Sequence, residues 1–335
     1  MKERIPSRVS EARLDQLRQE AEIRGRVKEP GIRPLGAPFP QATPEHGYYG
    51  LPLLKKPTWK WEIPAYFFVG GAAGAAAVVG AAAQLSGDER LVREARWVAA
   101  AGATLSAPLL VSDLGRPERF LAMLRVFKLQ SPMSVGAWTL TAFGSTSAAA
   151  AFAKLIEEKS EGRTPVRILG DAAAALSAAT GLGMATYTGV LVGATAIPVW
   201  QENVRLLPLH FGASALASAV SLLELLGNRN GALNALGFGA AVVETGVGAV
   251  FENETGRAFK PLKEGESGTI TRIGGVLSGP APLLLRLASA LVGSGWRLRQ
   301  AAAVSSLAGS LITRYAWLEA GKESAKDPTI PLEIE

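Results

Sequence analysis

Five side chains that can donate hydrogen bonds or exchange protons lie near the ends of apolar segments: Glu62, Tyr66, Asp113, Arg116 and His210. Glu62 and Tyr66 are spaced i,i+4, so a helix would place them on one face, with Tyr66 about 6 Å deeper. A histidine can donate or accept a proton near neutral pH. These groups together offer hydrogen-bond donors, a proton-exchanging acid and a link to water, which is the chemistry of proton-coupled redox at a carbonyl.

Two of these features also have a purely structural interpretation. Asp113 and Arg116 flank a turn made by Gly115 and Pro117, so the pair could simply fasten an interfacial turn. His210 could be a buried histidine hydrogen-bonded to a neighbouring helix. Both alternatives stay open from the sequence.

Three more charged residues lie within apolar segments, where charge is costly and often functional. Glu244 is expected about 10 Å inside its helix, either protonated or paired. Arg286 is a possible partner for it, and a proton relay is the alternative. Glu224 lies near a helix end, where it could extend to the interface or contribute to a proton path.

The elements that position these residues are apolar runs of about the length needed to cross a 30 Å hydrocarbon core. We predict transmembrane helices at 63–85, 95–114, 135–156, 168–199, 206–226, 231–251, 273–292 and 301–318. The fourth is the longest, which suggests a tilt or a break near Gly189 and Gly193. The seventh is the weakest, because Pro280, Pro282 and Arg286 interrupt it.

Composition supports this all-α integral membrane fold. Of 335 residues, 48% are hydrophobic and 19% are charged, and the charges concentrate outside the apolar runs: twelve Lys and Arg lie in the first sixty residues. Small residues such as Gly70 and Gly74, a GxxxG pair, favour tight helix crossings. The chain lacks cysteine, which excludes thiolate ligation of an iron–sulfur cluster within it. The sequence shows no basic stripe interleaved with aromatic residues, so nucleic-acid binding is not indicated.

Three regions follow from these patterns. We expect residues 1–57 to form a polar N-terminal arm, with a helical or loosely ordered stretch at 7–27, and an extended Pro/Gly-rich strap. Residues 58–320 form the transmembrane helical domain, and residues 321–335 form a polar C-terminal tail. Eight crossings place both tails on one side, here called the N-side, together with the connections 112–134, 200–205 and 252–272. The unusual polar and aromatic residues gather on this side, which we interpret as the working face.

Several N-side motifs carry a family resemblance. DLGRPERFLAMLRVFKLQSPMSVGAW (113–138), TYTG (186–189) and the WxIPxYxFxGG pattern (61–71) resemble the NrfD/PsrC family, the membrane subunits of polysulfide-reductase-type molybdoenzymes. GSLITRYAWLEAGKESAKDP (309–328) is similar to the tail of a branch associated with formate-dehydrogenase-like enzymes. The resemblance covers about residues 48–328.

The resemblance implies two four-helix bundles and a quinone pocket near the N-side, with Tyr187 as the pocket tyrosine in its TYTG setting. It implies a four-cluster ferredoxin-like iron–sulfur partner, a molybdenum or tungsten catalytic subunit beyond it, and a multi-pass location in the cytoplasmic membrane. The bound substrate would be menaquinone or ubiquinone. With only His46 and His210 available, bis-histidine haem ligation within the membrane is not expected.

Three classes of function remain in competition. A quinone-reactive electron-transfer anchor would explain the N-side residues together with the motifs. A proton-coupled transporter would place its site near the midplane at broken helices, for which only the fourth and seventh runs give an indication. A purely structural anchor would not need this set of N-side polar groups.

Overall fold

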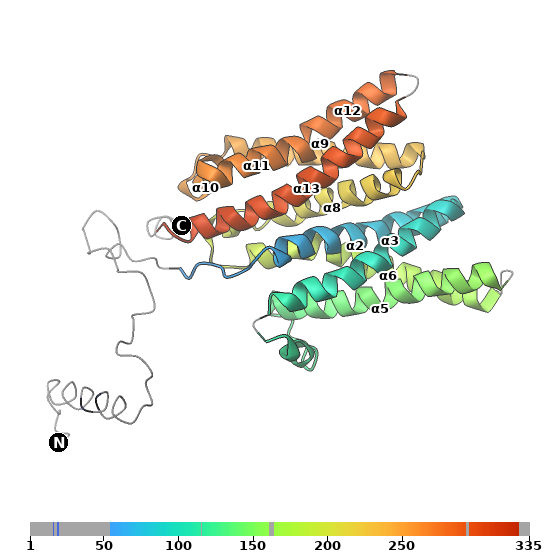
Figure 1. The fold of residues 1–335 in the computed structure, drawn as a ribbon, viewed down its shortest axis with the longest axis horizontal. Coiled ribbons are helices and arrows are strands. Elements are labelled where there is room, and N and C mark those ends of the chain that lie inside the picture. The colour runs from blue at the N-terminus through green and yellow to red at the C-terminus, as the bar shows by residue number, and fades with distance from the viewer. Residues whose placement is uncertain are drawn as a thin grey trace. The chain divides into compact units, whose positions relative to one another are not determined.

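The computed structural model describes residues 54–114, 116–160, 164–292 and 295–327, together with Gln16 and Gln19. Residues 1–51 and residues 52–335 form separate units, and all helices discussed here belong to the second. The described part of that unit is helical and contains no strand (Figure 1). The predicted arm and strap, including His46, lie outside the described residues except for Gln16, Gln19 and 54–57, as does the tail from 328 onward.

The long helices run side by side along one direction (Figure 1). They are α2 (Glu62–Ser86), α3 (Glu89–Ser112), α5 (Pro132–Lys159), α6 (Thr164–Gly193), α8 (Leu206–Leu225), α9 (Gly231–Asn253), α11 (Gly265–Ser278), α12 (Pro280–Leu291) and α13 (Trp296–Ser324). The short elements η2 (Pro117–Arg119), α4 (Phe120–Met123), α7 (Pro198–Gln201), η3 (Arg257–Phe259) and α10 (Lys260–Lys263) lie in the N-side connections.

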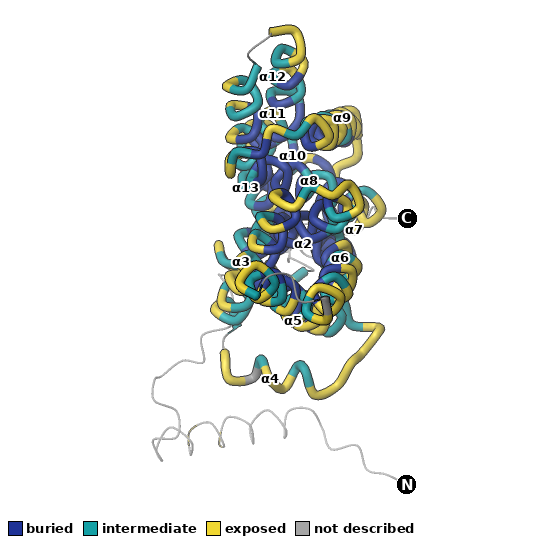
Figure 2. The backbone as a smooth tube through the Cα atoms, turned by 90° about the vertical axis from the view of Figure 1, so that its right-hand side faces the viewer, coloured by how far each residue is buried: buried dark blue, intermediate teal, exposed yellow. Residues whose placement is uncertain are grey.

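Five stretches of the described chain are long and apolar enough to cross a membrane: α2, 165–193 in α6, α8, α9 and the α11–α12 pair. The three remaining long helices, α3, α5 and α13, run alongside them. Many large apolar side chains of these helices, including Leu105, Phe152, Leu182 and Leu284, are exposed on the outside. Figure 2 shows the buried positions on the facing sides of the helices, as expected where the outer surface meets lipid.

Local sequence signals explain where the helices begin and end. Gly87, with a φ of 74°, ends α2, and the Asp88 carboxylate accepts the Leu91 N–H at 3.1 Å to begin α3. Ser131 and Pro132 begin α5 in the same way, with the serine hydroxyl accepting the Ser134 N–H. These caps produce tight reversals, so consecutive helices lie antiparallel.

Contacts divide the helices into two groups. The first group contains α2, α3, α5 and α6, and the second contains α8, α9, α11, α12 and α13. Helix α8 contacts α2 and α6 and so joins the two groups.

The first group is packed closely enough for backbones to touch. A β-carbon at Gly74 of α2 would lie 2.3 Å from the Gly181 carbonyl oxygen of α6, and one at Gly102 of α3 would lie 2.5 Å from the Ala73 β-carbon. Only glycine permits these approaches. The sequence expectation of small-residue crossings is therefore confirmed for α2, α3 and α6.

Two predicted runs differ from the observed helices. The run at 168–199 does not form one long helix. Helix α6 is continuous through Gly189 and ends at Gly193, which confirms the break expected near these glycines, and the separate turn α7 follows. The run at 273–292 is divided at Gly279 into α11 and α12, because Pro280 cannot continue the hydrogen-bonding of the preceding turn. Helix α13 also extends to Ser324, past the expected start of the polar tail.

Candidate functional site

Two tyrosines from different helices meet near the N-side of the first group. The hydroxyl of Tyr66 in α2 is hydrogen-bonded to the hydroxyl of Tyr187 in α6, and Tyr66 is completely buried. Because α6 ends at Gly193, Tyr187 lies about 9 Å from the helix end, at a depth comparable with that of Tyr66.

Glycine makes room for this pair. A β-carbon at Gly136 of α5 would lie 2.3 Å from a ring carbon of Tyr187. The tyrosine ring thus occupies the space that any larger residue at 136 would fill. The SPMSVGAW motif, which contains Gly136, therefore positions Tyr187 through packing.

A cavity of about 50 Å³ opens beside the two tyrosines. Its walls come from α2, α3, α5, α6 and the connection after α3: Trp59, Ile63, Tyr66, Phe67, Leu110, Asp113, Leu114, Phe120, Met123, Met133, Ala137, Tyr187 and Leu191. Ligand pockets typically measure roughly 300–1,000 Å³. The chemistry suits a quinone ring, with aromatic and thioether walls and two phenols, but its entry requires movement of flexible side chains such as Met123 and Met133.

Asp113 is the carboxylate of this cavity. It also accepts a hydrogen bond from the Lys60 backbone N–H at 3.1 Å, which fastens the end of α3 to the start of α2. Asp113 is thus both a structural fastening and the acid closest to the N-side mouth. Arg116, by contrast, is exposed and makes no ion pair with Asp113 in the described structure, so the interpretation of the two as a pair is wrong.

Two other predicted residues lie away from the cavity. Glu62 does not share its wall with Tyr66 and lies instead beside Tyr315 of α13, whose hydroxyl donates to the Trp61 carbonyl at 3.0 Å. His210 lies in the second group, where its ring packs edge-on against Phe251 and Trp317. Sequence spacing predicts that Glu62 and Tyr66 share a helix face, but it does not determine which neighbouring helix each side chain meets.

A cluster of charges around one fully hydrogen-bonded carboxylate lies in the second group, at the end opposite the N-side. Glu224 is 0% exposed and binds Arg286 through two hydrogen bonds of 3.1 and 2.8 Å. It also accepts two hydrogen bonds, of 3.1 and 2.6 Å, from Arg299. Arg286 donates further to Asn234 at 3.0 Å. The expected pairing of Arg286 with Glu244 is therefore wrong, and Glu224 does not extend to the interface.

Glu244 belongs to a different buried cluster, near the N-side. Its Oε1 lies 3.5 Å from Nδ1 of His210, and the Ser278 hydroxyl lies beside the carboxyl group, but neither carboxylate oxygen makes a hydrogen bond of acceptable geometry in the described structure. Arg314 lies nearby, donates to the Phe211 carbonyl at 2.9 Å and stacks 3.7 Å over the Phe211 ring, but its Nε and Nη1 atoms lack partners. This cluster is fully buried but incompletely hydrogen-bonded.

Sequence reasoning missed Arg299 and Arg314. Arg314 is in the middle of the run 301–318, and an arginine there is costly enough that it should have been selected as a candidate. Arg299 precedes that run by two residues, so no hydropathy signal distinguishes it from a flanking surface cation. Arg96 of α3 was missed in the same way: it is buried and pairs with Asp171 of α6 at 2.9 Å.

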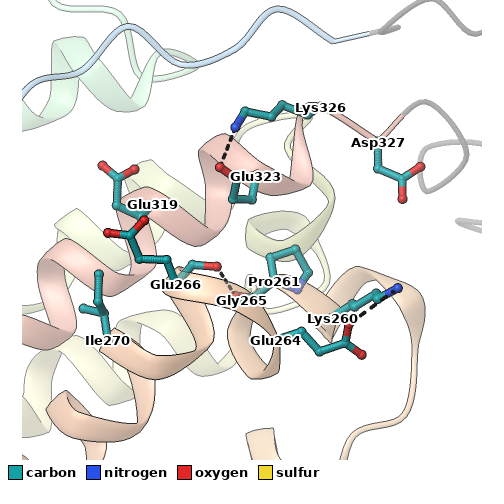
Figure 3. A pocket seen from close by; sticks show the side chains of 11 residues that line it. Lys260, Pro261, Glu264, Gly265, Glu266, Ile270, Glu319, Glu323, Lys326 and Asp327 are labelled. Carbon is teal, nitrogen blue, oxygen red and sulfur yellow. Dashed lines mark hydrogen bonds and ion pairs between the residues drawn. The ribbon is translucent and has the colours of Figure 1, made fainter.

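A larger polar hollow of about 740 Å³ lies on the N-side of the second group (Figure 3). Charged side chains of α10, α11 and the end of α13 surround it, among them Lys260, Glu266, Glu319, Glu323 and Lys326. It shares no residue with the tyrosine cavity. Its open, charged walls do not suit an apolar redox carrier.

Comparison with known protein families gives a match. The family described as polysulphide reductase, NrfD, matches residues 53–234, more than half of the chain. This chain belongs to the NrfD family. Members of the family are membrane subunits of quinone-interacting oxidoreductases and associate with iron–sulfur and molybdopterin catalytic subunits. No curated protein gave a significant match.

The NrfD match begins before α2 and ends four residues into α9. It includes both cavity tyrosines and Asp113, and it also includes His210 and Glu224. Glu244, Arg286, Arg299 and Arg314 lie beyond it. Their clusters are therefore described here from the geometry of this chain alone.

Proposed function

We propose that this chain is the membrane anchor and quinone-reactive subunit of a multisubunit oxidoreductase. It would pass electrons between menaquinone or ubiquinone and a ferredoxin-like iron–sulfur subunit docked on the N-side. In this proposal the eight helical passes cross the cytoplasmic membrane as two four-helix bundles. A molybdopterin subunit, of the formate-dehydrogenase-like type that the C-terminal motif suggests, would lie beyond the iron–sulfur partner.

The observation that carries this proposal is the hydrogen-bonded pair Tyr66 and Tyr187 in the N-side cavity. Each phenol has one O–H donor. When one tyrosine donates to the other, the second keeps its own hydrogen free to donate to a quinone carbonyl. The pair therefore supplies a positioned donor without leaving a buried phenol unsatisfied.

Proton exchange requires a second group, and Asp113 is well placed for it. Reduction of a quinone takes up two electrons and two protons, and oxidation of the quinol releases them. Asp113 lines the cavity at its N-side mouth, so it can transfer protons between N-side water and the tyrosine pair. Electrons would pass to or from the partner on that same side.

Substitutions in the cavity test this function in the purified complex. Tyr187→Phe and Tyr66→Phe should lower quinone-linked turnover by about 10²-fold, typical of the loss of a proton-transfer or donor group. Artificial-dye activity of the partner subunits and copurification should persist. Tyr315→Phe is the matched control, because its hydroxyl lies on the N-side but outside the cavity.

Asp113→Asn distinguishes a role of Asp113 in proton transfer from its role in holding the end of α3 to the start of α2. An asparagine oxygen can still accept the Lys60 N–H, but it cannot take up a proton. Slower quinone turnover with intact assembly would support the proposal. Loss of assembly together with both activities would show that Asp113 is structural, and proton-coupled solute uptake by the chain without partners would favour a transporter.

A further inference from the structure

The buried face of α8 carries a continuous series of polar side chains. His210, Ser214, Ser218, Ser221 and Glu224 recur at intervals of three or four residues and so lie on one side of the helix. All five are buried, with 4% exposure or less. In such an apolar helix, burying five polar groups in one row costs free energy, so we expect each group to be hydrogen-bonded or to have a function.

The facing side of α13 carries a complementary series. The hydroxyls of Ser214 and Ser310 are 2.7 Å apart, Arg314 donates to the backbone beside His210, and Arg299 binds Glu224. These pairs show that α8 and α13 are antiparallel along the whole series. We call this set of facing residues on α8 and α13 the polar column.

Interhelical serine hydrogen bonds can be purely structural, but a structural role requires that the groups be paired. Several buried atoms along the column and at its Glu244 end have no hydrogen-bond partner in the described structure: Ser221 Oγ, His210 Nδ1 and both carboxylate oxygens of Glu244. Such atoms ordinarily bind internal water or exchange protons. The unpartnered atoms therefore point to a hydrated path rather than to helix attachment.

The polar column extends over most of the thickness of a membrane's hydrocarbon core. From His210 to Glu224 the helical rise amounts to about 21 Å. A hydrocarbon core measures about 30 Å. One end is the incompletely paired Glu244 cluster near the N-side, and the other is the Glu224 cluster.

The two ends differ in charge when Glu244 has released its proton. At the N-side end the positive charge of Arg314 is then balanced by one carboxylate, Glu244. Glu224 contributes one negative charge, whereas Arg286 and Arg299 contribute two positive charges, so this end carries a surplus of one positive charge. A fixed positive charge in a narrow path repels protons. Arg299 provides the surplus, because Arg286 alone already neutralises Glu224 through two hydrogen bonds.

We propose that the polar column is a proton path through the second helix group, held closed at its far end by the surplus charge of Arg299. A proton taken up by Glu244 passes to the adjoining hydroxyl or water oxygen, which releases its own proton to the next. The proton that leaves at the far end equals the one taken up, and no electron moves. This function is separate from the tyrosine cavity and does not depend on quinone binding there.

Proton flux into vesicles tests the path. The full chain is reconstituted in lipid vesicles that contain a pH-sensitive dye, and a potassium diffusion potential drives proton entry. Wild-type vesicles should stay close to protein-free vesicles. Arg299→Gln should raise the flux at least about tenfold, equivalent to about 1.4 kcal/mol at the barrier. Arg299→Met, also uncharged, provides the same test if the glutamine variant fails to fold.

Second substitutions show whether the flux follows the column. Adding Ser214→Ala with Ser310→Ala, or Glu244→Gln, to Arg299→Gln should return the flux to the wild-type level. Adding Ser177→Ala should not, since Ser177 is a buried, unpartnered serine of the first group. Arg93→Gln is the charge control, because Arg93 is half exposed near the same membrane face as Arg299.

Three results would overturn the proposal. The first is a folded Arg299→Gln variant with wild-type flux, and the second is a wild-type chain that already conducts as fast as that variant. The third is a flux in Arg299→Gln that survives removal of Ser214, Ser310 and Glu244. Any of these would leave the column as a helix-packing interface.

Discussion

The second helix group contains two buried glutamates that differ in their hydrogen-bond partners. Glu224 is 0% exposed and accepts four hydrogen bonds from two arginines. Glu244 is 3% exposed and has no hydrogen-bond partner in the described structure, with His210 as its closest charged or titratable contact at 3.5 Å. The residue type and the depth of burial are the same, and only the neighbours differ.

This difference separates structural charge from exchangeable charge. A carboxylate held by two guanidinium groups is stabilised in its ionised form, and its loss would leave two arginines uncompensated. A carboxyl without partners has little to lose by binding a proton. Burial alone therefore does not identify a proton-transfer residue, whereas burial combined with missing partners does.

The largest effect should come from breaking the paired cluster. Glu224→Gln removes the negative charge between Arg286 and Arg299 and should lower the free energy of unfolding by roughly 3–5 kcal/mol, the usual cost of an uncompensated buried charge. Thermal unfolding in detergent would measure it. Glu319→Gln is the control, since Glu319 is partly exposed and should change stability by less than about 0.5 kcal/mol.

A double substitution sharpens this prediction. Glu224→Gln with Arg299→Gln leaves a single buried arginine rather than two, so it should recover part of the stability lost in Glu224→Gln. If Glu224→Gln were as stable as the wild type, the cluster would contribute nothing to the fold, and its contrast with Glu244 would disappear.

An intermediate effect should come from displacing Arg286. A β-carbon at Gly237 would lie 2.4 Å from the guanidinium carbon of Arg286, so Gly237→Ala forces the arginine away from Glu224. Overpacking of this kind costs about 1–3 kcal/mol. Gly239→Ala on the same helix meets open space and should be neutral or slightly stabilising. Equal melting temperatures for the two variants would contradict the described position of Arg286.

The smallest effect should come from Glu244→Gln. Because the Glu244 carboxyl group makes no hydrogen bond, replacing it with the glutamine amide removes no hydrogen bond. The change in the free energy of unfolding should therefore stay below about 1 kcal/mol. An infrared spectrum should show a protonated carboxyl band in the wild type that the variant lacks. Destabilisation as large as that of Glu224→Gln would show instead that Glu244 is ionised and bound to Arg314.

Most helices could be located from hydrophobicity alone. Helix α8 begins at the predicted residue and ends within one residue of the predicted end, because apolar length and the N-side turn both define it. Helix α3 begins six residues earlier than its apolar run, since the Asp88 cap and the charged residues that follow it form helix outside the run. The end of α6 at Gly193 agrees with the break expected near Gly189 and Gly193, although apolar residues continue to Val199.

The pairing of charged residues could not be predicted. The depth of a charged residue along its helix follows from its residue number. Which side chain it pairs with depends on how each helix is rotated about its axis and on where α11 and α12 divide. The helical run is interrupted at Gly279, and Arg286, seven residues further on in α12, binds Glu224 rather than Glu244. Tyr66 and Tyr187 were selected as candidates for separate reasons, and only the structure shows that they touch.

The backbone contact between Gly74 and Gly181 has an electrical consequence for the first group. With α2 and α6 touching there and the Met184 side chain packed against Gly70, no water fits between these two helices at this level, and their contact forms a dry layer. A membrane voltage, worth about 2.3 kcal/mol per charge for every 100 mV, would fall across such a dry layer rather than across the hydrated face above it. A quinone beside Tyr66 and Tyr187 would therefore exchange its protons at the potential of the N-side, and its midpoint potential would follow the pH of that compartment alone.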